Sequence, residues 1–112
     1  ARVLDFFEAK GLTPELLREV SRHQVGLLAR EFDALDLDPR AIRRDRSVPP
    51  ERIAGFLALR APQAGEIATR LRARGVYSDT RADILRLGPA PYLRDEQLRV
   101  AIGLLGEVVR AG

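Results

Sequence analysis

Arg86 is the residue whose type and setting best fit ligand binding. It lies within an otherwise apolar stretch of strand length, Ile84-Leu85-Arg86-Leu87. Strand alternation places Arg86 on the face opposite Leu85 and Leu87, and Gly88 with a proline-rich turn then leaves the strand end open to a ligand. A planar guanidinium binds a carboxylate through two parallel hydrogen bonds. The sequence therefore makes Arg86 a candidate carboxylate-binding residue, with a solvent-facing strand arginine as the structural alternative.

Other residues with acid–base potential have structural explanations. His23 is the only histidine, and the sequence names no nucleophile or orienting carboxylate for it, so we expect a packed or half-exposed side chain. Asp79 and Asp83 flank a predicted hairpin turn. Paired carboxylates can do acid–base work, but turn aspartates more commonly bond to neighbouring backbone. Because no phosphate loop or nucleophile elbow is present, the residues favour a binding or accessory domain over a complete catalytic apparatus.

Composition excludes several classes of site and partner. The 112 residues suit one domain, and without cysteine there is no disulfide framework or thiolate metal site. One histidine excludes a zinc site built from several. No apolar run approaches the roughly 20 residues of a membrane helix, so we expect a cytoplasmic protein with no membrane partner. All basic residues except Lys10 are arginine, but the net charge is only +3. The interspersed acids disfavour a nucleic-acid surface.

A long helix is predicted near the start of the chain, over about 13–36. Thr13 can cap it, Pro14 fits its first position and Asp38-Pro39 stops it. Its apolar stripe is expected to be buried. The stripe consists of Leu17, Val20, Gln24, Leu28 and Leu35, widened by Leu16, Leu27 and Phe32.

A connector over 38–50 separates this helix from the rest of a single domain, 1–112. It carries Arg40, Arg43, Arg44 and Arg46, but Asp45 and Glu51 interrupt the run. With no aromatic residue for a base to stack on, a solvated loop is favoured over a basic patch.

An α+β small domain is predicted over 51–112. Its expected elements are a strand at 53–60, a helix between Pro62 and Gly75, a strand beginning at Val76-Tyr77, a turn at 78–83, a strand at 84–87 and a helix from Asp95 to Arg110. The predicted fold is a two-layer α+β domain. A small, mostly antiparallel three-stranded sheet is covered on one face by helices and preceded by the long helix.

The stretch from Gly75 to Tyr92, GVYSDTRADILRLGPAPY, resembles the C-terminal domain of fold-type-I pyridoxal-phosphate enzymes. Within these it is most similar to kynureninase and the class V aminotransferases. The shared pattern is a helix ending in Arg-Gly-Val, an Asp-x-Arg turn, a strand with a single arginine, a proline-rich turn and a final helix with an acidic start. The segments 55–62 and 13–35 resemble the family's first small-domain strand and the long helix before it.

The resemblance implies that Arg86 binds the α-carboxylate of an amino-acid substrate, with Arg81, Asp79 and Tyr92 in supporting positions. It implies neither a catalytic residue nor a metal ligand in this chain. Pyridoxal phosphate would be held mainly by a large domain that this chain lacks, and Lys10 lies in the wrong region to be the Schiff-base lysine. The chain alone is therefore expected to be inactive, with its own large domain as a partner and a homodimer as the usual assembly of the family.

Departures from the family pattern occur after the strand. The turn has Ala90 and Pro91 before Tyr92, where kynureninases usually place an apolar residue before the tyrosine, and Arg94 replaces the usual Ser or Thr helix cap. Substrate specificity, and the choice between carbon–carbon hydrolysis and transamination, therefore stay open. The alternatives are a stand-alone α+β ligand-binding or protein-interaction domain and, less favoured because only Phe56 and Tyr77 offer sheet-face aromatics, a nucleic-acid binder.

Overall fold

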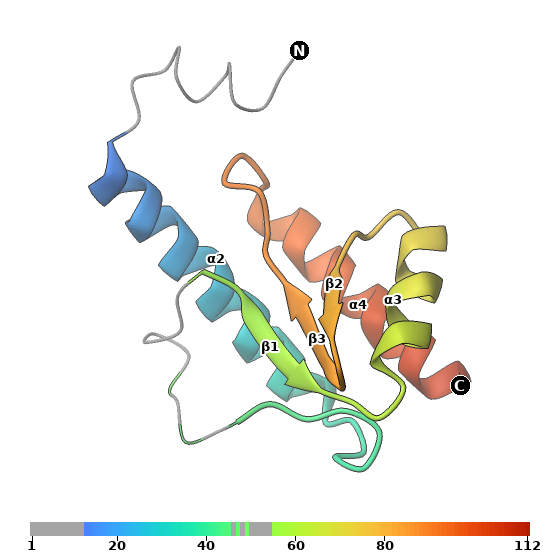
Figure 1. Ribbon diagram of the computed structural model, residues 1–112. Coiled ribbons are helices and arrows are strands. Elements are labelled where there is room, and N and C mark those ends of the chain that lie inside the picture. Colours follow the sequence, from blue (N-terminus) through green and yellow to red (C-terminus); the bar gives the residue numbers. More distant parts are fainter. Residues whose placement is uncertain (1–12, 46, 48, 50–54) are drawn as a thin grey trace.

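The computed structural model describes residues 13–45, 47, 49 and 55–112. Its elements in chain order are α2 (Pro14–Leu35), β1 (Leu57–Arg60), α3 (Ala64–Ala73), β2 (Asp79–Arg81), β3 (Ile84–Leu87) and α4 (Asp95–Ala111). Figure 1 shows α2 and α4 behind the sheet and α3 at its side. The structure confirms the predicted α+β fold with a long first helix. Lys10 and the predicted strand start at Ile53 lie outside the described residues.

β3 is the central strand of the sheet, whose order is β1-β3-β2. It pairs antiparallel with both neighbours (Figure 1). The register places Leu57 opposite Leu87 and Leu59 opposite Leu85, and all four side chains are buried. The alternate positions form the outer face, where Arg86 lies between Ala58 and Asp79. Strand alternation thus separates an aliphatic inner face from an outer face that carries the candidate ligand-binding residue.

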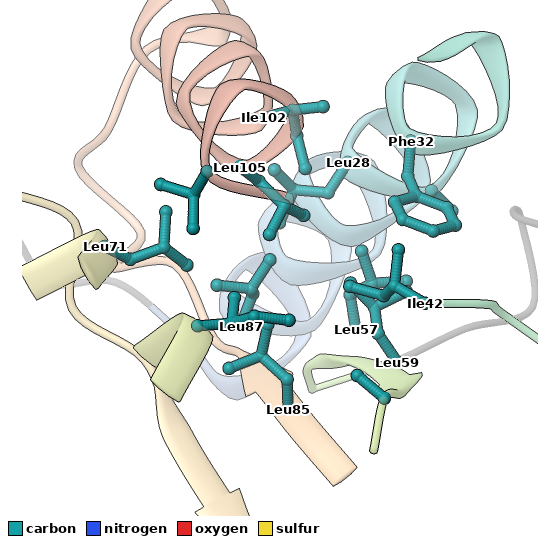
Figure 2. Close-up of a cluster of buried hydrophobic side chains, with 14 of the residues drawn as sticks. Leu28, Phe32, Ile42, Leu57, Leu59, Leu71, Leu85, Leu87, Ile102 and Leu105 are labelled. Carbon is teal, nitrogen blue, oxygen red and sulfur yellow. The ribbon is translucent and has the colours of Figure 1, made fainter. Parts of the chain in front are cut away.

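The core is aliphatic and lies between the inner face of the sheet and the three helices. Figure 2 shows leucines of β1 and β3 meeting Leu28 and Phe32 of α2, Leu71 of α3, and Ile102 and Leu105 of α4. Burial of such side chains is the main favourable term in folding. None of the helices among the described residues combines the length and apolar character that crossing a bilayer requires.

α2 begins where its capping residues predict. The Thr13 Oγ1 accepts a hydrogen bond from the Leu16 N–H at 3.1 Å, and Pro14 occupies the first turn. The helix ends when Asp36 adopts a left-handed conformation, with φ of 53°, just before the predicted stop. Burial is continuous only from Gln24 to Ala29 and at Phe32. The prediction that Leu16 lies in the core is wrong, because the first turns of α2 extend past the sheet and leave Leu16 exposed.

β2 begins three residues later than predicted, at Asp79 instead of Val76. Val76 does not begin a strand, because its N–H donates to the Leu71 carbonyl at 2.9 Å and completes the cap of α3. Gly75 makes this cap possible with φ of 89°. The strand therefore starts at Asp79, and the turn shrinks to Ala82 and Asp83.

The connector after α2 is more ordered than the predicted solvated loop. Arg43 forms an antiparallel bridge with Arg60, through backbone hydrogen bonds of 2.9 and 2.8 Å. The Arg44 side chain is 4% exposed and donates to both carboxylate oxygens of Asp33, at 3.0 and 2.6 Å. The prediction missed both contacts because each needs α2 or β1 to be folded beside the connector. Arg46 lies outside the described residues.

Candidate functional site

Arg86 is the central residue of a candidate anion-binding site on the outer face of the sheet. Its carbon Cζ lies 5.3 Å from the centre of the Phe56 ring, which precedes β1. This distance is within the range of a cation–π contact. From the other side, the Arg86 Nη2 donates to Asp79 Oδ2, and the two residues are direct partners across β2 and β3. The guanidinium is therefore held between Phe56, just before β1, and Asp79 of β2.

A hollow of about 340 Å³ surrounds this guanidinium. It is lined by Gly55, Phe56, Tyr77, Ser78, Asp79, Arg86 and Gly88. Two of its polar atoms, Arg86 Nε and Ser78 Oγ, are buried and have no hydrogen-bond partner among the described residues. Buried donors without partners are costly, and each one calls for an explanation such as a missing ligand. Both groups can donate, so the hollow suits an anion with two acceptor oxygens.

The middle of α2 tethers the segments that frame this hollow. The Ser21 hydroxyl accepts from the Gly55 N–H at 3.2 Å, just before Phe56. The Gln24 Nε2 donates to the Ala90 carbonyl at 2.9 Å and the Leu93 carbonyl at 3.3 Å, in the turn that follows β3. One helix therefore holds Gly55, which lines the hollow, and the turn that begins just after Gly88, another residue of its lining. Sequence reasoning placed Gln24 in the buried stripe but could not identify these partners.

His23 has the carboxylate partner that the sequence could not name. Its Nε2 lies 2.8 Å from Oδ1 of Asp95, in the first turn of α4. The side chains are 60% and 45% exposed, so the contact is an exposed link between α2 and α4. This outcome agrees with the expectation of a half-exposed histidine.

The structure brings some of the predicted site residues together and separates others. Arg86 and Asp79 meet in the hollow, whereas Arg81 is exposed opposite Ile84 and does not line it. Tyr92 lines a neighbouring, mostly apolar hollow of about 530 Å³, which shares Tyr77 and Gly88 with the first.

Asp79 and Asp83 do not act as the turn-forming pair that was expected. Asp79 is a strand residue bound to Arg86, and the Asp83 carboxylate accepts from Arg60 Nη1 at 3.1 and 3.2 Å. Each carboxylate has an arginine on a different strand within reach, which is a stronger partner than neighbouring backbone.

The described residues offer few groups that could hold a cofactor or a metal ion. Within the described residues, no group of three or more His, Cys, Asp or Glu side chains could hold a metal ion. The described ranges also contain no lysine. Pyridoxal phosphate needs a lysine for its Schiff base, so these residues do not fit that group as its main binding site.

The fold is a small α+β domain whose outer sheet face carries a hollow lined by Arg86, with the guanidinium of Arg86 held between Phe56 and Asp79. The model of the kynureninase C-terminal domain family matches residues 17–105 of the chain. The protein therefore belongs to this family, as the stretch from Gly75 to Tyr92 had predicted. A search of the curated proteins found no significant match.

Proposed function

We propose that this chain is the C-terminal domain of a pyridoxal-phosphate enzyme acting on an amino acid, and that Arg86 binds the α-carboxylate of the substrate. The proposal rests on two buried hydrogen-bond donors in the hollow that have no partner among the described residues. A guanidinium is fixed by Phe56 and Asp79, yet its Nε and the Ser78 hydroxyl have no partner among the described residues. A substrate carboxylate supplies two acceptor oxygens for such donors.

In this proposal the cofactor lies in a large domain outside this chain, where it supplies the electron sink for reaction at the substrate α-carbon. Arg86 contributes orientation, because a carboxylate held by two hydrogen bonds has a fixed direction for its α-carbon. The proposed reaction is kynureninase-type hydrolysis of a carbon–carbon bond. Class V transamination is the alternative, and identification of the products separates the two. The proposal includes a cytoplasmic location and a homodimeric assembly.

The test is the intact mass of the native gene product after borohydride reduction, which fixes any cofactor bound to a lysine. The proposal expects a mass several times the 12.5 kDa of this chain, with a reduced pyridoxyl group on a lysine of the large domain and not on Lys10. A native product near 12.5 kDa without an adduct would favour the stand-alone binding domain instead.

A further inference from the structure

Asp79 accepts a hydrogen bond from the guanidinium of Arg86, which a ligand carboxylate would also need as a donor. The register places it directly across from Arg86, and its Oδ2 accepts from Nη2. Carboxylates bind arginine best through a fork of two neighbouring N–H groups. In the fork formed by Nε and Nη2, Asp79 takes one donor and Nε keeps no partner among the described residues. The internal ion pair is therefore half of the contact that an external carboxylate would make.

A second carboxylate cannot join this pair without cost. Two carboxylates sharing one guanidinium lie within a few ångströms of each other and repel, as closely spaced acidic pairs do. Arg81, the other arginine of this strand pair, does not line the hollow, and among the described residues Arg86 is the only cation that does. No second cation of the described part of the chain therefore offsets this repulsion. A ligand carboxylate must therefore compete with Asp79 for Arg86.

Of the two partners, Asp79 is the one that can move away. Its side chain is 63% exposed, whereas that of Arg86 is 29% exposed and lies over Phe56. Asp79 also begins a three-residue edge strand, while Arg86 belongs to the central strand. Water can solvate the released aspartate at little cost, so exchange of carboxylates leaves the arginine in place.

We propose that Asp79 is an internal competitor that holds Arg86 in the unliganded domain and sets the affinity of the site for carboxylates. This inference rests on the proposed carboxylate-binding role of Arg86. It also changes the role expected for Asp79 from the sequence, since a supporting residue strengthens binding and a competitor weakens it.

The test is acetate titration of the 112-residue chain, followed through the Arg86 Nε–H signal in ¹H–¹⁵N spectra at ionic strength matched with chloride. Asp79→Asn removes the competing charge and keeps the shape, so acetate should bind roughly two- to fivefold more tightly, the range of an exposed ion pair. The matched control is Asp83→Asn, which removes the same charge from the same hairpin. Asp83 pairs with Arg60 and not with Arg86. This variant should leave the acetate affinity unchanged.

The outcomes separate the two proposals. Equal or weaker acetate binding by Asp79→Asn, with the Arg86 signal still shifting, would overturn the competitor role and leave the carboxylate site intact. An equal gain in Asp83→Asn would also overturn it, because the effect would then be general electrostatics. If acetate shifts the Arg86 signal in neither the wild-type chain nor Asp79→Asn, the carboxylate-binding role itself fails.

Discussion

The side-chain amide of Gln24 and the backbone carbonyl of Ala90 are joined by a 2.9 Å hydrogen bond across the core, although 66 positions separate them in the sequence. The same Nε2 donates to the Leu93 carbonyl at 3.3 Å. Gln24 is 2% exposed, so these bonds form away from water. They fix the turn that carries the chain from β3 and Arg86 to α4.

Replacing Gln24 with leucine should destabilise the protein by about 2 kcal/mol. The volume is nearly conserved, but the turn loses both side-chain donors and its carbonyls must find other partners. Urea unfolding followed by circular dichroism measures the free energy. The control is Gln63→Leu, because Gln63 is exposed and makes no side-chain cap bond. Equal stability of the two variants would contradict the role of Gln24.

Arg44→Met should cost about 2 to 3 kcal/mol of unfolding free energy. The side chain is almost fully buried and binds both oxygens of Asp33, so its loss leaves a partly buried carboxylate without its main counter-ion. The estimate is below that for a fully buried pair because Asp33 is 25% exposed. Arg40→Met is the control. Arg40 pairs with Asp38 in solvent, where such pairs contribute little, so its replacement should lower the free energy of unfolding much less than Arg44→Met does.

The boundaries of α2 and α4, and the face on which Arg86 lies, could be predicted because each depends on neighbours in sequence. Thr13 caps α2, acidic residues begin α4, and alternation within β3 separates Arg86 from Leu85. These signals act within a few residues, through backbone hydrogen bonds, the helix dipole and the pleat. Local physics therefore gave the order of elements and the principal candidate residue.

The surroundings of Arg86 could not be predicted because they come from distant segments. The contact with Phe56 requires the pairing of β1 with β3, and the pairing with Asp79 requires the register of a turn shorter than expected. The shift of β2 follows from the use of Val76 in the cap of α3. Composition of the turn residues alone does not distinguish that cap from the first residue of a strand.

Asp38 should titrate below the usual range for aspartate in the folded protein. The side-chain hydrogen bond from Arg40 is the main cause that lowers its pKa from the ordinary 3.8. Because the folded pKa lies below the unfolded one, the stabilisation is present above the unfolded pKa and is lost as the pH falls through the folded pKa. Carboxyl-carbon NMR measures the midpoint.

Arg40→Gln provides the matching comparison for Asp38. It should move the Asp38 midpoint up towards its ordinary value. Asp45 serves as an internal control in the same titration. Its pKa is lowered mainly by the Ser47 side chain, so its midpoint should not move. A fixed Asp38 midpoint in the variant would show that Arg40 is not the cause.

Ser78→Ala should weaken acetate binding at Arg86 by roughly 10- to 100-fold, the range of one hydrogen bond to a charged group. The hydroxyl is buried and has no partner among the described residues, so its loss should not lower the thermal midpoint. Ser47→Ala is the control, because Ser47 does not line the hollow. Unchanged affinity in Ser78→Ala would remove the hydroxyl from the binding site.

Arg86→Lys should abolish the acetate-induced shifts of the Ser78 and Gly88 amides, which line the same hollow. Lysine keeps the charge but has no planar fork for a carboxylate and loses the contact of the guanidinium with Phe56. In the proposed pyridoxal-phosphate enzyme, kcat/KM for the amino acid should fall roughly 10- to 100-fold, the free energy of a hydrogen bond between charged groups. Arg81→Lys changes the same side chain on the neighbouring strand, outside the hollow, and should preserve both acetate binding and turnover. If the two lysine variants bind acetate equally well, the outer face attracts anions only by its overall charge, and Arg86 is not a carboxylate receptor.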